Sequence, residues 1–237
     1  MTGVVSPNEP RTVRVAVVAL AVALVLSSCS GDASETSPAD DGSTTEAAGP
    51  PTTTAADCRP TSGGVAQGGS VESSGVPSFV KLGPGPDITA EEAEAEAPAR
   101  KGIPLLISGT VYAADCETPL AGVLIEAWQT DARGVYGPGQ GNSELRCCYL
   151  QGTVKTDADG GYEIQTIRPG HYRGEESPPP AHIHLNVHHR DAGVLTEVLF
   201  AGDPYLPAGE SLAEVIRLRK DGSRLVGRFD IVLAATG

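Results

Sequence analysis

The chain has 237 residues, with 30 Asp and Glu against 17 Lys and Arg, which gives a formal net charge of −13. This acidic balance offers no basic surface of the kind that neutralises phosphates, so we expect no nucleic-acid partner. The 29 glycines and 19 prolines favour short strands and turns. They exclude a long coiled coil and a membrane protein with several spans.

Residues 1–29 have the pattern of an export signal. Arg11 and Arg14 precede an apolar run over residues 15–26, which is too short to cross a bilayer, since a spanning helix needs about 20 residues. The run ends in Leu-Ser-Ser-Cys, which resembles the lipobox of bacterial lipoproteins. The resemblance implies that Cys29 carries a lipid that anchors the protein to the outer face of the cell membrane. The alternative is ordinary secretion, with cleavage near the same place.

Residues 30–101 predict a disordered tether. As far as about residue 75 they consist mainly of Ser, Thr, Ala, Asp, Gly and Pro. Such a segment buries too little apolar surface to offset the entropy lost on ordering. The acidic stretch 87–96 fits either a short helix or a solvated linker. We therefore expect the folded domain to begin at residue 102.

Residues 102–237 predict one all-β domain, an antiparallel β-sandwich whose long loops carry a metal site. Short apolar runs alternate here with turns rich in Gly, Pro and Asp, which is typical of sandwiches. We expect about eight strands, at residues 103–112, 122–129, 149–156, 162–167, 181–188, 194–200, 213–218 and 227–233. Trp128 is expected in the core, and Asp203 is expected to shape a loop near the mouth of a pocket.

Four cysteines remain besides Cys29, namely Cys58, Cys116, Cys147 and Cys148. An even number in an exported chain predicts disulfide bonds. Because a bond between the adjacent Cys147 and Cys148 is geometrically awkward, we expect Cys58 and Cys116 to cross-link to that pair. A four-thiolate metal site is the alternative, although no C-x-x-C spacing supports it.

All five histidines lie between positions 171 and 189. In the run PAHIHLNV, the alternation of a strand places His182 and His184 on one face and the apolar residues between and after them on the other. Two histidines on one face, about 6–7 Å apart at Cα, can chelate one metal ion. An H-x-H pair without a metal is the alternative.

Two tyrosines precede this pair. Tyr136 ends the run EAWQTDARGVY, and Tyr172 ends the turn Pro-Gly-His-Tyr. Taken singly, Tyr172 fits a corner tyrosine of a sandwich and Tyr136 an ordinary strand-end residue. Together with the histidines they resemble the intradiol ring-cleavage dioxygenases, the family of catechol and protocatechuate dioxygenases. The resemblance spans residues 103–233 and is carried by GTVYAADCETPLAGVLIEAWQTDARGVY, LQGTVKTDADGGYEIQTIRPGHY, PAHIHLNV, LFAGDP and RFDIVL.

The resemblance implies one Fe(III) per chain, with Tyr136, Tyr172, His182 and His184 as its protein ligands and hydroxide as a fifth ligand. Phenolates are hard oxygen donors that suit Fe(III), whereas His and Cys alone would indicate zinc or Cu(I). Two phenolates and one hydroxide balance the charge of the ion. The site is therefore neutral and compatible with a low-dielectric pocket.

The activity implied by the resemblance is cleavage of a catechol-type ring between its two hydroxyls by O2, which gives a muconate-type diacid. The partners are then a small aromatic diol and O2. In the family the catechol binds the iron through both oxygens and displaces the hydroxide and an axial tyrosinate, which corresponds to Tyr172. Tyr136 and His182 correspond to the equatorial ligands and His184 to the other axial one. Because the metal supplies most of the catalysis, no serine or cysteine nucleophile is needed.

Pro179 departs from the family pattern, in which an arginine usually stands three residues before the first histidine and helps to polarise the substrate. Arg173, next to Tyr172, is a candidate to replace it, and Arg168 and Arg146 are alternatives. The departure favours a rival function, a non-catalytic surface module that retains the scaffold. A second rival is a His-based copper or zinc protein, which would not need the tyrosines.

Overall fold

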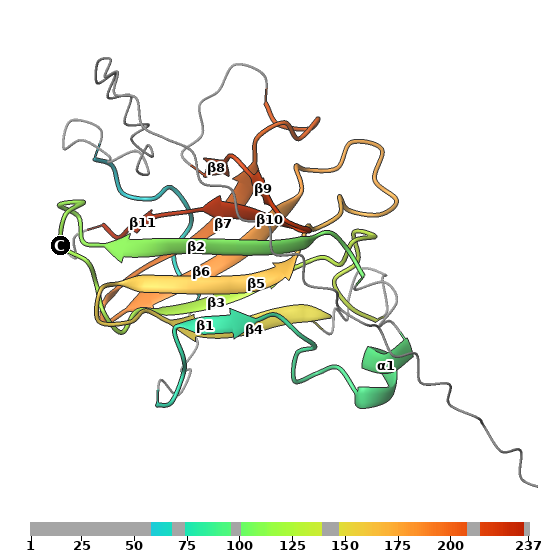
Figure 1. Ribbon diagram of the computed structural model, residues 1–237, viewed down its shortest axis with the longest axis horizontal. Coiled ribbons are helices and arrows are strands. Elements are labelled where there is room, and N and C mark those ends of the chain that lie inside the picture. Colours follow the sequence, from blue (N-terminus) through green and yellow to red (C-terminus); the bar gives the residue numbers. More distant parts are fainter. Residues whose placement is uncertain (1–57, 68–73, 96–100, 139–146, 208–213, 235–237) are drawn as a thin grey trace, which may run out of the picture. The chain divides into compact units, whose positions relative to one another are not determined.

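The computed structural model describes residues 58–67, 74–95, 101–138, 147–207 and 214–234 (Figure 1). The expected signal peptide and its Cys29 lie outside these residues. No helix in the described ranges is long and apolar enough to cross a membrane.

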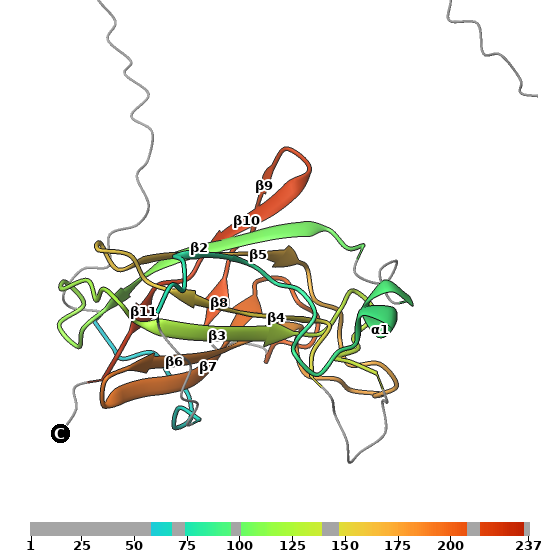
Figure 2. The same ribbon diagram turned by 90° about the horizontal axis from the view of Figure 1, so that it is seen from below.

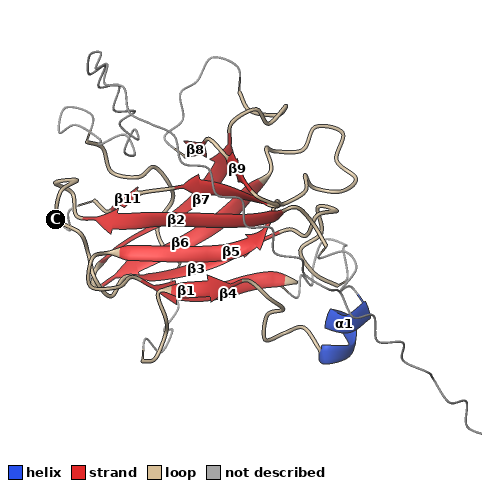
Figure 3. Cartoon of the chain, viewed as in Figure 1, coloured by secondary structure: helices blue, strands red, loops and turns tan. Residues whose placement is uncertain are grey.

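Two sheets form a sandwich, which Figure 2 shows edge-on. The first sheet has the order β1-β5-β2-β10-β9, with β11 also paired to β2, and the second has the order β4-β3-β6-β7-β8. The strands of the first sheet are β1 (Phe79–Lys81), β2 (Pro104–Tyr112), β5 (Gly161–Ile167), β9 (Arg219–Asp221), β10 (Arg224–Arg228) and β11 (Ile231–Val232). Those of the second sheet are β3 (Leu124–Gln129), β4 (Leu150–Lys155), β6 (His182–His189), β7 (Ala192–Phe200) and β8 (Val215–Ile216). The short helix α1 (Ala90–Ala95) lies at one end of the sandwich (Figure 3).

The core lies between the two sheets. Every second side chain of β2, β3 and β7 is buried, which is the alternation expected of strands with one face against a core. The most deeply buried members include Ile107, Val111, Ile125, Leu185 and Ile231, each at most 1% exposed. Each such side chain stabilises the fold by about 1.5–3 kcal/mol relative to full exposure.

The structure confirms the β-sandwich, and its strand directions refine the expected topology. The central pairs β2–β5, β3–β4, β3–β6 and β6–β7 are antiparallel. Four other pairs, β1–β5, β10–β2, β11–β2 and β7–β8, are parallel, so both sheets are mixed. The single strand expected over residues 227–233 is divided between β10 and β11, because between them the Asp230 carboxylate accepts the Thr110 N–H in place of a backbone carbonyl.

Part of the expected tether folds with the domain, so the predicted boundary at residue 102 is wrong. Strand β1 pairs with β5, and Leu82, only 4% exposed, belongs to the core. Helix α1 begins with a capping box in which Thr89 and Glu92 bond to each other's backbone N–H. The sequence conceals this because isolated apolar residues such as Leu82 and Ile88 provide the anchoring, with no run of them to reveal a strand.

Residues 58–67, called here the strap, also lie against the sandwich. Gly64 pairs with Leu195 on the edge of β7 through backbone N–O distances of 2.8 and 3.0 Å. The backbone of Gln67 exchanges two hydrogen bonds with the Asn186 side chain on β6. A Cβ atom at Gly63 would collide with the Leu195 carbonyl, so the close approach of the strap to β7 requires glycine there.

The disulfides are Cys58–Cys116 and Cys147–Cys148. The expected cross-links from Cys58 and Cys116 to the Cys147–Cys148 pair are therefore wrong, and so is the four-thiolate site. The strap brings Cys58 to the turn after β2, where its Cα lies 5.8 Å from that of Cys116, inside the usual range for a disulfide.

Candidate metal centre

The four side chains that the sequence singles out meet at one point on the outer face of the second sheet. His182 and His184 come from β6, Tyr136 from the loop after β3, and Tyr172 from the loop after β5. The Tyr136 Oη lies 2.8 Å from the Tyr172 Oη, 2.9 Å from His184 Nε2 and 3.4 Å from His182 Nε2. The Tyr172 Oη lies 2.9 Å from His182 Nε2, and the two Nε2 atoms are 3.1 Å apart.

These separations fit one metal ion. Two donors bound about 2.0–2.1 Å from the same ion at angles of roughly 90–110° lie about 2.8–3.4 Å from each other. The five distances, from 2.8 to 3.4 Å, cover the same interval. The donor set of two phenols and two imidazoles suits a ferric ion better than zinc or Cu(I).

The contact made by Nδ1 of each imidazole determines that Nε2 faces the phenols. His182 Nδ1 lies 2.7 Å from the Pro180 carbonyl oxygen, which can only accept, so Nδ1 carries the proton. His184 Nδ1 lies 3.4 Å from the Glu197 carboxylate, which likewise favours a proton on Nδ1. The two Nε2 lone pairs then face each other, an arrangement that a cation between them would stabilise.

Burial dominates the acid–base properties of this cluster. It raises the pKa of the Tyr136 hydroxyl, and the neighbouring Tyr172 adds to the increase. Burial also raises the pKa of Tyr172, and burial together with His182 lowers that of His184 to about 4. Without a cation the two phenols and the His184 imidazole are neutral at pH 7, and only a strong local positive charge would stabilise phenolates here.

Glycines bring the two tyrosine loops together. Gly134 has φ +81°, and a Cβ atom there would collide with the His171 carbonyl of the Tyr172 loop. Gly170, on that loop, donates its N–H to the Asp131 carbonyl at 3.0 Å. The loops therefore pack backbone against backbone, which places the two phenols in contact. Sequence reasoning missed both glycines, and the only available signal was their position near each tyrosine.

Asp203 ties together the residues that precede two of the four side chains. Its carboxylate accepts hydrogen bonds from His171 at 2.9 Å, just before Tyr172, and from the Ala181 N–H at 3.1 Å, just before His182. Burial favours protonation of this carboxyl, but the hydrogen bonds from Tyr205, His171 and Ala181 outweigh it and lower its pKa. Asp203 therefore does more than shape a loop, because it joins the turn of Tyr172 to the start of β6.

Comparison with known proteins agrees with this geometry. Residues 75–236, more than half of the chain, match the model of a protein family described as dioxygenase. The chain belongs to the intradiol dioxygenase family. It is 33% identical over 118 residues to catechol 1,2-dioxygenase 1 of Acinetobacter lwoffii, and the aligned stretch covers 44% of this chain and 38% of that protein. It is also 33% identical over 124 residues to the protocatechuate 3,4-dioxygenase beta chain of Burkholderia cepacia, which covers 48% of this chain and 51% of the relative. The match thus spans about half or less of these relatives.

Solved structures support the same family. The dioxygenase domain of a dioxygenase–carbohydrate-binding protein fusion from Streptomyces sp. SirexAA-E superposes with a TM-score of 0.52 at 27% identity, and covers 75% of this chain and 100% of that one. The 3-chlorocatechol 1,2-dioxygenase of Rhodococcus opacus 1CP gives a TM-score of 0.52 at 19% identity, with 77% and 76% of the two chains covered. The second likeness concerns the fold alone.

The arginines considered as substitutes for the family's usual one lie away from the four converging side chains in this member of the family. The Arg168 guanidinium stacks on the Phe200 ring at 3.9 Å and lies 3.6 Å from the Asp203 carboxylate. Arg173 and Pro179 are exposed, and Arg146 lies outside the described residues. Within the described ranges, neither Arg168 nor Arg173 is hydrogen-bonded to the four converging side chains.

Glu197 and Trp128 complete the surroundings of His184. Glu197 lies opposite His184 in the β6–β7 register, and its carboxylate forms a group with His182 and His184 whose ligand atoms lie within 4.8 Å of one another. Sequence reasoning missed Glu197, although the hairpin register could have revealed it. The Trp128 ring stacks on His184 at 4.9 Å and 16°. The expectation that Trp128 is a core residue is wrong, because Ala127 and Gln129 take the inward positions of β3.

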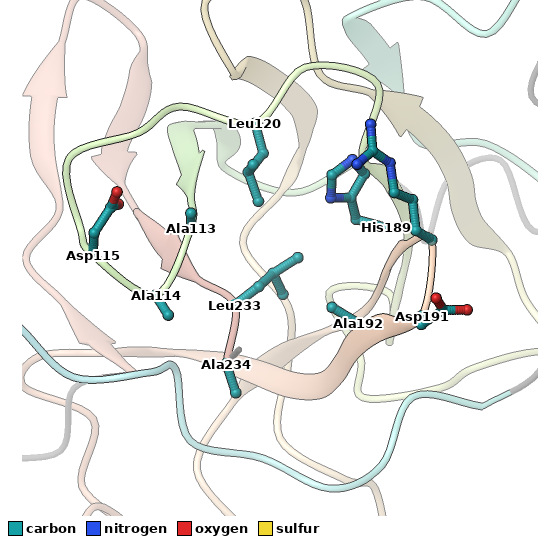
Figure 4. Close-up of a pocket in the computed structure, with 10 residues that line it drawn as sticks. Ala113, Ala114, Asp115, Leu120, His189, Asp191, Ala192, Leu233 and Ala234 are labelled. Carbon is teal, nitrogen blue, oxygen red and sulfur yellow. The ribbon is translucent and has the colours of Figure 1, made fainter. Parts of the chain in front are cut away.

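Two cavities lie at opposite ends of β6. One of about 450 Å³, called here the His184 cavity, is bordered by the strap, β7, Glu214 and His184. A larger one of about 570 Å³ lies beside the β6–β7 turn and is lined by His189, Asp191 and small apolar residues such as Ala113 (Figure 4). The larger cavity includes none of the four converging residues, so size alone does not identify the site.

Proposed function

We propose that this protein is a non-haem Fe(III) intradiol dioxygenase that cleaves a catechol-type ring between its two hydroxyls with O2 to a muconate-type diacid. The observation that carries the proposal is the convergence of two phenol oxygens and two imidazole nitrogens within 2.8–3.4 Å. In a copper or zinc protein with histidine ligands, neither tyrosine would be needed as a ligand.

Tyr136, Tyr172, His182 and His184 would hold the ion. Bound iron would supply the positive charge that keeps phenols and catechol hydroxyls ionised at neutral pH and would activate the ring towards O2. The protein's own residues set the geometry: the Pro180 carbonyl orients His182, while Glu197 and the Trp128 ring orient His184.

Tyr172 is the residue that we assign as the proton acceptor. Its Oη is within hydrogen-bond distance of both Tyr136 Oη and His182 Nε2. The loop that carries it is exposed from residue 173 to 177, whereas Tyr136 follows the buried Gly134 and Val135. As a phenolate, Tyr172 would take a proton from a catechol hydroxyl at its Oη, and it would return the proton as the product leaves.

The test is to load the purified chain with iron and to measure its visible absorption and its O2 uptake with catechol, hydroxyquinol and protocatechuate. We expect one iron per chain, a visible band from tyrosinate bound to Fe(III), and uptake with at least one diol. Tyr136→Phe should abolish or shift the band and stop uptake, whereas Tyr112→Phe, on the first sheet, should do neither. A red, iron-loaded protein that consumes no O2 would instead indicate a non-catalytic module, and a colourless zinc protein would contradict the iron centre.

We also propose that the chain is exported and anchored by a lipid on Cys29. The disulfide Cys58–Cys116 supports export, because stable disulfides are typical of oxidising compartments outside the cytoplasm. In cells fed a labelled fatty acid, the full-length chain should carry label in the membrane fraction, and Cys29→Ala should lose both the label and the anchoring. Unlabelled, released protein from the unaltered chain would favour ordinary secretion.

A further inference from the structure

Polar side chains are buried at the end of the sandwich from which the two tyrosine loops emerge. Strand β3 ends there, ahead of the Tyr136 loop, and β5 ends there, ahead of the Tyr172 loop. Four polar side chains at these two strand ends are at most 7% exposed, namely Gln129, Thr130, Asp131 and Thr166. Burying a polar side chain costs free energy unless it finds hydrogen-bond partners. The partners that these residues find therefore indicate what they do.

The amide of Gln129 joins the two sheets across the core. Gln129 faces inward from β3, and Thr166 faces inward from β5. The amide Oε1 accepts a hydrogen bond from Thr166 Oγ1 at 3.0 Å. The amide Nε2 donates to the Ile167 carbonyl at 2.9 Å and to the Thr130 carbonyl at 3.1 Å. Because both N–H groups and the oxygen are used, an apolar side chain of the same size would leave two carbonyls and a hydroxyl without these bonds.

Thr130 connects the start of the Tyr136 loop to the Tyr172 loop. Its Oγ1 donates to the Gly170 carbonyl at 2.8 Å, and the Gly170 N–H donates in return to the Asp131 carbonyl at 3.0 Å. Gly170 stands two residues before Tyr172. A pair of hydrogen bonds thus joins the two loops close to one of the two phenols.

Asp131 extends this connection to Tyr136. Its carboxylate accepts the Arg133 N–H at 2.8 Å and the Val135 N–H at 3.1 Å, and its own N–H donates to the Val135 carbonyl at 2.8 Å. The turn that ends directly before Tyr136 is therefore closed on itself. Turn chemistry explains such bonds within one loop, but it does not explain the buried bonds described above, which run to the other loop.

Resting on the proposed function, we infer that Gln129 and Thr130 are positioning residues that hold the two phenols at the separation that one metal ion requires. The two loops leave opposite sheets, so a small shift of either loop would change the Oη–Oη distance of 2.8 Å between Tyr136 and Tyr172. Hydrogen bonds across the core prevent that shift at the base of both loops. Within the described ranges neither residue is hydrogen-bonded to the four converging side chains, and both act through the backbone of the loops.

The test uses the six tyrosines of the full chain as reporters. The metal-free chain is labelled with 3-fluorotyrosine, and its 19F signals are assigned with the Tyr136→Phe and Tyr172→Phe variants. Thr130→Val keeps the shape of the side chain and removes the hydroxyl that donates to the Gly170 carbonyl. We expect it to shift the signals of both Tyr136 and Tyr172 and to leave that of Tyr162, on β5, in place. Thr130→Ser retains the hydroxyl and should restore both signals.

Thr196→Val is the matched control. Thr196 is also a buried threonine, at 3% exposed, but its Oγ1 has no hydrogen-bond partner among the described residues. The same substitution there removes no hydrogen bond and should leave the signals of both phenols in place. Thr166→Val, which removes the bond to the Gln129 amide, should shift both signals as Thr130→Val does. It takes the place of Thr130→Val if that variant does not fold.

Iron binding gives a second readout. In competition with a chelator, Thr130→Val should bind iron about tenfold more weakly than the unaltered chain, since residues that orient metal ligands typically contribute at least that much to affinity. Its visible tyrosinate band should shift as well. Thr130→Ser and Thr196→Val should match the unaltered chain in both measurements.

The outcomes separate this inference from the proposed function. Phenol signals that stay in place in Thr130→Val and Thr166→Val, or that move as far in Thr196→Val, would overturn the positioning role even if the protein cleaves catechol. Shifted signals with an unaltered iron affinity would overturn it too. The expected shifts in a protein that consumes no O2 with any diol would support the positioning of the phenols and contradict the dioxygenase activity.

Discussion

Each imidazole of the centre is fixed by an acceptor on the side away from the phenols, and the two acceptors differ in kind. His182 uses a backbone carbonyl, which no side-chain substitution can remove, at 2.7 Å. His184 uses the Glu197 carboxylate, at 3.4 Å. The orientation of His184 therefore depends on one replaceable side chain, and this makes Glu197 a positioning residue that mutation can test.

Glu197→Ala should weaken iron binding about 10–100-fold, because His184 loses the acceptor that keeps the Nδ1 proton and directs the Nε2 lone pair inward. Glu197→Gln should retain most of the affinity, since an amide oxygen also accepts from Nδ1. The measurement is competition for iron with a chelator of known affinity, and Glu163→Ala serves as the control. Equal losses for the Ala and Gln variants would contradict the positioning role.

At the scale of the elements, the centre depends on two loops and one strand that are joined by backbone contacts. The loop that precedes Tyr136 meets the Tyr172 loop at Gly134. There the Arg173 N–H donates to the Gly134 carbonyl at 3.3 Å. The Asp203 loop then joins the Tyr172 turn to the start of β6. Changes in these contacts should alter the centre without touching the four side chains themselves.

Gly134→Ala should lower the stability of the fold and the iron content together. The substitution adds a side chain at φ +81° and forces the His171 carbonyl away. The backbone conformation alone costs on the order of 1–2 kcal/mol, and the displaced loop adds to that cost. Gly122→Ala is the matched control, because Gly122 has φ +78° with no atom within 4 Å of the added Cβ. Urea unfolding should show a larger loss for Gly134→Ala, and only that variant should lose iron; equal losses would mean that the loop contact is unimportant.

The Asp203 contacts predict a dependence on pH. Because the pKa of Asp203 is lowered from its ordinary 3.8, its contribution to stability is complete above about pH 4. It is lost as the pH falls through the lower, folded-state value. Asp203→Asn should therefore be less stable than the unaltered protein at pH 6, and the difference should shrink towards pH 3. Urea midpoints measured across this range check the prediction, and a difference that grows as the pH falls would contradict it.

At the scale of the whole molecule, the sequence predicts the sandwich and the four converging residues more fully than the segments around them. Alternation in β2, β3 and β6 indicates buried strands, and the H-x-H pattern indicates a shared face, since both are local properties. Glu197, Asp203 and the strap depend on contacts between residues far apart in the chain. The Gln67–Asn186 contact, for example, joins residues 119 positions apart, and no local pattern signals it.

The Cys58–Cys116 disulfide should stabilise the fold by fixing the strap to the turn after β2. It joins residues 58 positions apart, and closing a loop of that length in the unfolded chain corresponds to about 4 kcal/mol. Cys58→Ser should lower the thermal unfolding temperature, and the double variant with Cys116→Ser should match it, because both remove the same bond. An unfolding temperature equal to that of the unaltered, oxidised protein would mean that the hydrogen bonds of the strap with Leu195, Asn186 and Val232 hold it without the disulfide.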